Sequence, residues 1–193
     1  MGFDQGFDSF RRMKGFEGKA SELVKHSTRW VSALEQDSSA PFFLYLHFLV
    51  PHGPYTPDGS CVQEFLAGLE SKDPIVKQGL VVNLLSGERT LRQLSAADMD
   101  YLLTLYDAEI RDVDDAVAEL HEFLTSQDLI DSTIIVFTSD HGEGSLEHDS
   151  FKRGRHVYGL TNGVLARVDT PESKRGHKSG LRPLAHGTIE LQK

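Results

Sequence analysis

Apolar residues recur at helical spacing in two stretches of the chain, residues 21–36 and residues 95–126. The longer stretch keeps steps of three or four residues, at Met99, Leu102, Tyr106, Ile110, Val113, Val117, Leu120 and Leu124. Ser95 precedes it and Asp98 follows three residues later, which is a capping-box pattern. We therefore expect an amphipathic helix in each stretch. The acidic residues of the longer helix fall mostly off its apolar face and are expected to be solvated: Asp107, Asp112, Asp114, Asp115 and Glu119.

Two short segments rich in apolar, aromatic and β-branched residues favour strands instead. Phe42–Phe48 runs into a loop of three prolines and two glycines at residues 51–59, and Thr133–Thr138 runs into Ser139-Asp140-His141-Gly142. Because a long helix separates the two segments, we expect the crossover of a parallel sheet, with Thr133–Thr138 as a central buried strand. The predicted fold class is α/β, a largely parallel sheet flanked by helices.

The remaining segments of the chain show weaker patterns. Residues 1–19 favour a loop, residues 60–93 short helices, Val164–Val168 one more short strand, and residues 169–193 a poorly ordered tail. A chain of 193 residues with 39% apolar and 25% charged residues can form one globular domain. We therefore expect a domain over residues 1–168, followed by the tail.

The composition argues against several classes of function. Acidic residues number 29 against 20 basic ones, and no basic face indicates nucleic-acid binding. The longest apolar run, Phe42–Val50, is too short to span a bilayer. Cys61 is the single cysteine, so a disulfide within the chain and a Cys-based zinc site are excluded. No base or basic cluster adjoins Cys61 in the sequence, so we expect its thiol to be inert.

The loops that follow the two predicted strands carry the candidate chemistry, because ligands of open α/β sheets bind at the carboxyl ends of strands. Asp140 and His141 offer one oxygen and one nitrogen to a divalent cation, which is too few for a complete site. The alternative for this pair is a turn with a helix cap. His52 either contacts a ligand or belongs to a packed loop, and His47 is expected to be a core histidine.

Four segments resemble the sulfatase branch of the alkaline phosphatase superfamily, in the order and spacing of that family. They are residues 2–8, residues 43–55 with their Pro-His-Gly-Pro-Tyr loop, residues 106–115 of the long helix, and Ser139-Asp140-His141-Gly142-Glu143 followed by Glu147-His148. The resemblance covers residues 2–158 and implies an alkaline phosphatase-like core. It also implies a hydrolase of sulfate esters (a sulfuric ester hydrolase) that acts on small-molecule or carbohydrate substrates.

The resemblance implies roles for individual residues. Asp140 and His141 match metal ligands of the family, and His52 matches a histidine that contacts the sulfate ester. Arg153 falls where the family has a cationic substrate contact, and its guanidinium could grip a sulfate, with His156 as the alternative. The implied cofactor is a divalent metal. Calcium is the family's commonest ion, and manganese and zinc stay open because His141 is a softer ligand than an amide oxygen.

Part of a sulfatase site has no counterpart in the sequence. The family has two further aspartate ligands and a Cys-x-Pro-x-Arg motif, whose cysteine or serine becomes the formylglycine nucleophile, nearer its N-terminus. Cys61 does not stand in such a motif, so the chain holds no candidate nucleophile and no formylglycine. We therefore expect the chain to begin partway into a catalytic domain and to be inactive alone. Residues 1–6 lack a signal pattern, which leaves the compartment of the parent protein open.

Two alternatives to a sulfatase remain. A phosphonate or phosphate ester hydrolase of the same superfamily shares these later motifs, and a catalytically inactive fragment or binding module would need no nucleophile. A parallel strand without its neighbours would expose an apolar edge, so self-association of the chain is also expected.

Overall fold

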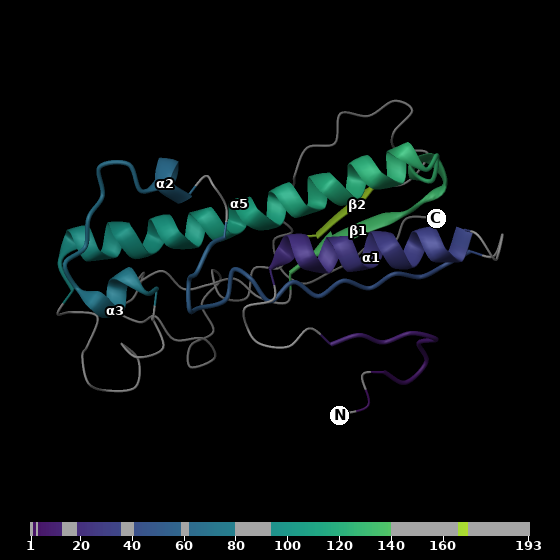
Figure 1. The fold of residues 1–193 in the computed structure, drawn as a ribbon, viewed down its shortest axis with the longest axis horizontal. Helices are drawn as coiled ribbons and strands as arrows, with labels where there is room; N and C mark the ends of the chain where they lie inside the picture. Colours follow the sequence, from purple (N-terminus) through teal and green to yellow (C-terminus); the bar gives the residue numbers. More distant parts are fainter. Residues whose placement is uncertain are drawn as a thin grey trace.

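The computed structural model describes residues 2, 4–12, 19–35, 41–58, 62–79, 94–139 and 166–169. Its elements are helices α1 (Ala20–Glu35), α2 (Val62–Phe65), α3 (Pro74–Lys77) and α5 (Ala96–Ser126), a short 3-10 helix η2 (Ile130–Ser132), and strands β1 (Ile135–Thr138) and β2 (Ala166–Asp169). The long helix α5 forms the axis of this arrangement (Figure 1). α1 lies along its second half, and α2 and α3 lie beside its first half.

The beginning of α5 confirms the predicted capping box. The Ser95 hydroxyl accepts from the Asp98 backbone N–H at 3.2 Å, and the Asp98 carboxylate accepts from the Ser95 N–H at 3.2 Å. Both bonds satisfy N–H groups that the first turn of a helix leaves without intrahelical partners. The predicted helices at residues 21–36 and 95–126 are therefore confirmed to within one residue at each end.

The buried face of α5 differs from the predicted one by a small rotation. Ile110, placed on the apolar face by its spacing, is 43% exposed, whereas the neighbouring Glu109 is 1% exposed. The buried positions follow steps of three and four residues at Leu102, Leu105, Glu109, Val113 and Ala116. A carboxyl thus occupies the centre of a stripe that is otherwise apolar. The acidic residues 107, 114, 115 and 119 are exposed as predicted, and Asp112 is half-buried.

Two separate hydrophobic clusters pack against α5. The first cluster joins the first half of α5 to α3 and the loop before α2, and its buried members are Tyr55, Val76, Leu102 and Leu105. The second cluster joins the second half of α5 to α1, and its buried members are Ala20, Val24, Val113 and Ala116. Glu109 lies one turn from Leu105 and one turn from Val113, so it marks the boundary between the clusters.

Residues 41–50 correct the prediction of a strand at Phe42–Phe48. Their backbone is assigned to no strand, although exposed and half-buried side chains alternate along them. The inner side chains pack on the helices, as in the edge-to-face contact of Phe42 with Trp30 at 6.2 Å between ring centroids. Their neighbours point outward, so Phe43 is 73% exposed and His47, expected in the core, is exposed. The segment has the pleat of a strand, but the described residues give it no ladder partner.

The described sheet is a pair of antiparallel strands. β1 pairs with β2, with Val136 opposite Val168, so the strands predicted at residues 133–138 and 164–168 form with shifted bounds. Neither the parallel pairing nor the burial expected for residues 133–138 is seen within the described part of the chain. Ile134 and Val136, which share one face, are 63% and 60% exposed, and Phe137 on the opposite face is 43% exposed.

The remaining predictions of secondary structure agree with the structure where it describes the chain. The described residues between 1 and 19 form no helix or strand, and α2 and α3 are the short helices expected between residues 60 and 93. Among the helices described, none combines the length and the apolar character that crossing a membrane requires.

Candidate functional site

His52 lies in the loop of residues 51–58, which follows the extended segment. Its side chain is half-buried, and its ring Nδ1 lies 2.6 Å from the carbonyl oxygen of Gly53. A carbonyl can only accept a hydrogen bond, so Nδ1 carries the proton in this arrangement. The backbone N–H of His52 also donates to the Leu49 carbonyl at 3.1 Å. The loop contains two cis peptide bonds, Val50–Pro51 and Gly53–Pro54.

Tyr55 fixes the loop from within the first cluster. Its side chain is buried, and its ring meets that of Tyr106 on α5 edge to face, 5.5 Å between centroids. Its backbone N–H donates to the Gly79 carbonyl at 3.0 Å. Gly79 has φ +61°, and a Cβ built on it would lie 2.0 Å from the Tyr55 carbonyl oxygen. Only glycine therefore fits this close approach of two backbones.

Two carboxyl groups on α5 hold the loop from the other side. Oε1 of Glu109 accepts from the backbone N–H of Thr56 at 2.7 Å, and Oδ2 of Asp112 accepts from the N–H of Asp58 at 2.7 Å. The two acceptors are three residues apart on one face of the helix, and the two donors are two residues apart on the loop. Sequence reasoning missed Glu109 because the apolar stripe was placed through Ile110. A stripe drawn through Leu105, Glu109 and Val113 would have found it.

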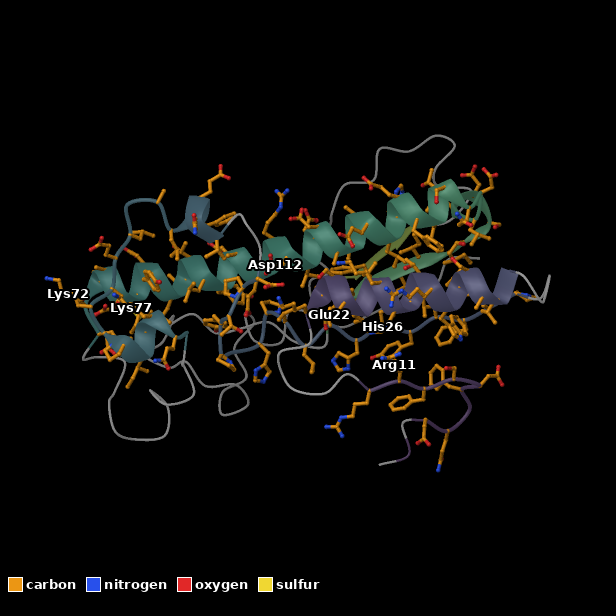
Figure 2. All side chains as sticks on the ribbon, in the orientation of Figure 1. Arg11, Glu22, His26, Lys72, Lys77 and Asp112 are labelled. Atoms are coloured by element: carbon orange, nitrogen blue, oxygen red, sulfur yellow. The ribbon has the colours of Figure 1, made fainter. Side chains whose placement is uncertain are left out.

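Lys19, directly before α1, adds an ion pair to this network. Its ammonium group contacts the Asp58 carboxylate, and both side chains are about half exposed. The hydrogen bond from Lys19 to Asp58 raises the pKa of the lysine above its ordinary value, and the negative charges of Asp58, Glu22 and Asp112 add to the effect. The labelled basic residues Lys72 and Lys77 lie around α3 at one end of the molecule, whereas Asp112 lies near the middle of α5 (Figure 2).

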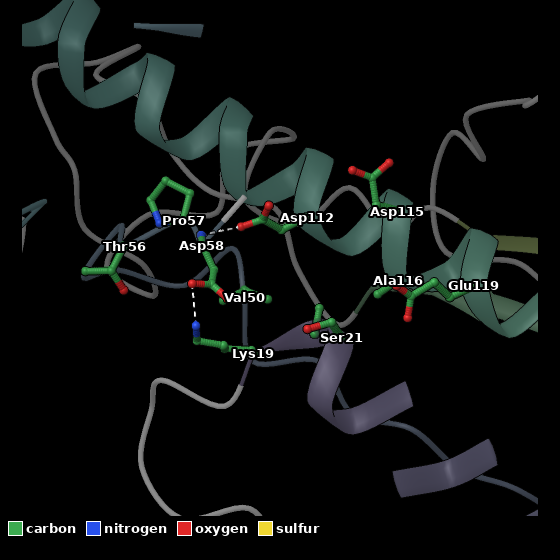
Figure 3. Close-up of a pocket in the computed structure, with 11 residues that line it drawn as sticks. Lys19, Ser21, Val50, Thr56, Pro57, Asp58, Asp112, Asp115, Ala116 and Glu119 are labelled. Atoms are coloured by element: carbon green, nitrogen blue, oxygen red, sulfur yellow. Dashed lines mark hydrogen bonds and ion pairs between the residues drawn. The ribbon is translucent and has the colours of Figure 1, made fainter. Parts of the chain in front are cut away.

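A pocket of about 560 Å³ opens beside the loop, between α1 and α5 (Figure 3). Its charged lining residues are Lys19, Asp58, Asp112, Asp115 and Glu119. His52 is not among its lining residues. Within the part of the chain that the structure describes, no three His, Cys, Asp or Glu side chains are arranged to hold a metal ion. The described walls of this pocket therefore do not form a metal centre.

The other predicted site residues lie outside the described residues: Asp140, His141, Arg153 and His156. Cys61, which we expect to be inert, lies outside them as well. β1 ends at Thr138, so Asp140 and His141 are the second and third residues after a strand that does form. Their roles, and those of Arg153 and His156, stay predictions. His52 is the predicted site residue for which the structure gives a geometry.

The family profile and the curated relatives that match this chain are all sulfatases. The sulfatase family profile matches residues 4–180. The chain is 29% identical over 147 residues to arylsulfatase K of Xenopus laevis, covering 66% of this chain and 27% of that protein. It is 25% identical over 147 residues to an arylsulfatase of Clostridium perfringens, covering 67% of this chain and 29% of that protein.

A solved structure shows the same fold. The phosphonate monoester hydrolase of Agrobacterium radiobacter aligns with a TM-score of 0.61 at 22% identity, over 79% of this chain and 33% of that one. The chain belongs to the sulfatase family, whose fold is alkaline phosphatase-like. It spans between 27% and 33% of the length of these three relatives.

Proposed function

We propose that this chain is the later part of the catalytic domain of a divalent-metal-dependent hydrolase of sulfate esters. The observation that carries the proposal is the match of the sulfatase family over residues 4–180. Residues 1–168 would form the partial catalytic domain, and residues 169–193 a tail. Small-molecule or carbohydrate sulfate esters are the proposed substrates. The names of the two arylsulfatase relatives support the sulfate ester as the bond that is hydrolysed.

The finer architecture belongs to the proposal as well. Residues 41–50 and β1 run in the same direction, away from the end of the molecule where α5 stops, while α1 and α5 run the opposite way (Figure 1). Strands that share a direction and are connected through helices are typical of a parallel sheet. We therefore take the extended segment and β1 to be strands of a largely parallel sheet, with their carboxyl ends at the active site.

His52 would contact the sulfuryl group through its imidazole, because its loop is the described part of the chain that matches a family substrate contact. Arg153 would supply a fixed positive charge to the same group, with His156 as the alternative. Balancing the charge that develops during ester cleavage is the chemistry that such groups perform. Cys61 is not in the family's nucleophile motif, so no residue of this chain is assigned as nucleophile.

Asp140 and His141 would hold the metal ion. A carboxylate oxygen suits calcium, and an imidazole nitrogen also suits manganese or zinc, so this donor pair fits a divalent cation but needs further ligands. When bound, such a cation polarises the ester oxygens and stabilises negative charge on them. The chain's own part would be to supply these two donors from the second and third positions after β1, a strand that pairs with β2.

Calorimetric titration of calcium and of manganese into the purified chain tests the metal assignment. Binding in the micromolar range that Asp140→Ala abolishes is the expected result. Asp131→Ala is the matched control. Asp131 is an exposed aspartate of η2, which precedes β1 in the sequence, so its replacement should leave binding unchanged. A folded chain that binds neither ion would refute a preformed half-site.

A phosphonate monoester hydrolase is the second candidate, and the structural match to the Agrobacterium radiobacter enzyme favours it. The two functions differ in the charge and shape of the transferred group. We would titrate inorganic sulfate and methylphosphonate into the metal-loaded chain and compare their affinities. Tighter binding of sulfate is expected, and tighter binding of methylphosphonate would support the second candidate instead. A chain that binds neither anion nor metal would support the inactive binding module.

A further inference from the structure

Glu109 interrupts the hydrophobic core at a position where an apolar side chain would pack. It is 1% exposed and lies on the buried stripe of α5, between Leu105 of the first cluster and Val113 of the second. A leucine there would continue the stripe and join the two clusters. Burying a carboxyl instead costs free energy unless hydrogen bonds compensate for lost water. Packing alone therefore gives no reason for a glutamate at this position.

The contact of Glu109 with the loop supplies that reason. Its Oε1 accepts from the Thr56 N–H at 2.7 Å, across 53 positions of sequence. The glutamate sits in the middle of a 31-residue helix, so the acceptor is held by a rigid element. Asp112, one turn further along, repeats the contact with the Asp58 N–H (Figure 3). Together they fix the loop backbone at two points on the same face of α5.

The path of the loop places His52 over this boundary. Val50, two residues before His52, packs against the second cluster, and Tyr55, three residues after it, is buried in the first. The loop therefore crosses from one cluster to the other, with His52 in the crossing. A segment tied only at its two ends could adopt several paths. The hydrogen bond from Thr56, the residue after Tyr55, to Glu109 fixes the loop backbone at the point where it meets α5.

We propose that Glu109 is a positioning residue for His52: its buried carboxyl anchors the loop and thereby fixes the orientation of the imidazole. The inference rests on the proposed role of His52 in the sulfate-ester site. In this proposal Glu109 acts through the loop backbone and not on a reacting group. Asp112 is the second, more exposed anchor, and its loss should loosen the loop less than the loss of Glu109.

Two substitutions separate positioning from stability. Glu109→Leu removes the acceptor but fills the boundary with an apolar side chain, so the fold should keep its stability. Glu109→Gln keeps the shape and an acceptor oxygen, so it should restore the wild-type behaviour. Leu124→Ala is the control for general destabilisation, because Leu124 is buried on the same helix near its far end.

The readout is the protonation pattern of the His52 ring in long-range ¹H–¹⁵N spectra of the whole chain, assigned with His52→Gln. In the wild type and in Glu109→Gln, the signal should show Nδ1 protonated, as the 2.6 Å contact with Gly53 requires. In Glu109→Leu that signature should give way to averaged tautomers. The Thr56 amide should exchange with solvent at least about tenfold faster, at an unchanged urea midpoint.

Two results would overturn the inference. One is a Glu109→Leu chain whose His52 signature equals that of the wild type. The other is a Leu124→Ala chain that loses the signature as fully as Glu109→Leu does, since general loosening would then explain the effect. Titration of inorganic sulfate into the wild-type chain tests the proposed function separately. If the signature is intact but sulfate does not perturb the His52 signals, His52 has no substrate role. Glu109 would then not serve to position a substrate contact.

Discussion

Replacing Gly79 with alanine should destabilise the chain far more than an ordinary glycine substitution. Gly79 has φ +61°, and an added Cβ would lie 2.0 Å from the carbonyl oxygen and 2.9 Å from the backbone nitrogen of Tyr55. Real Cβ atoms do not approach backbone so closely, so the two segments would have to separate. The Tyr55 N–H donates to the Gly79 carbonyl at 3.0 Å, and this hydrogen bond would be lost with the separation.

Three costs combine in this variant. The left-handed conformation costs an alanine about 1–2 kcal/mol. Loss of the hydrogen bond costs about 0.5–1.5 kcal/mol. Displacing packed backbone beside the buried Tyr55 ring costs about 1–3 kcal/mol more, as overpacking does elsewhere. We therefore expect the free energy of unfolding to fall by about 2.5–6.5 kcal/mol in Gly79→Ala.

Gly68→Ala is the matched control, because Gly68 has φ +81° and, its chain neighbours aside, no atom of the described residues lies within 4 Å of an added Cβ. It carries only the conformational cost, about 1–2 kcal/mol. Urea unfolding of the two variants, followed by circular dichroism, measures the difference. Equal losses in both variants would refute the reasoning, since they would mean that the approach of Gly79 to Tyr55 contributes nothing.

Three further predictions test the core, the cap and the ion pair. Leu102→Ala should lower the free energy of unfolding by about 2–5 kcal/mol, whereas Ile110→Ala should change it by less than about 0.5 kcal/mol in the same urea assay. Ser95→Ala should cost about 1 kcal/mol through loss of the cap, measured by thermal unfolding, and no loss would contradict the capping box. Asp58→Asn removes the partner that raises the pKa of Lys19, so it should lower the melting temperature near pH 7 at low salt. Because a raised lysine pKa stabilises below its unfolded value of 10.5, the difference from the wild type should vanish as the pH rises through the folded pKa. It should also shrink at about 0.5 M salt, and a difference that persists in both conditions would exclude the ion pair as its cause.

Local patterns in the sequence were sufficient to predict the helices. The bounds of α5 follow from apolar spacing and from the reciprocal bonds of Ser95 and Asp98, all of which involve residues within a turn of each other. The rotation of its buried face could not be read this way. Ile110 and Glu109 are adjacent, and which of them turns inward depends on the Thr56 backbone, which lies 53 residues away.

The strand prediction shows a different limit. Residues 41–50 alternate outward and inward as a strand does, so the sequence pattern was informative about their pleat. A strand also needs hydrogen-bond partners for its backbone, and the sequence of the segment alone does not determine which residues those partners are. The same holds for residues 133–138, where apolar composition indicated burial but Val136 is 60% exposed in the described part of the chain.

The candidate site was predictable to the extent that it consists of motifs. His52 was singled out from its loop and its resemblance to a family contact, and the structure adds the hydrogen bonds that hold it. The carboxyl groups of Glu109 and Asp112 had no motif that separates a loop anchor from a solvated acid. Their function became visible only when the loop and the helix were placed together in space.

The division of the core by Glu109 has a consequence for how the molecule opens. α5 is about 46 Å long, so its two clusters occupy different halves of a single rod. Each half can lose its packing partners, α3 at one end or α1 at the other, while the remaining half keeps its own cluster. We therefore expect the chain to unfold as two cooperative units that share a helix. Under mild denaturant the end that carries α1 and the end that carries α3 should then unfold at different free energies.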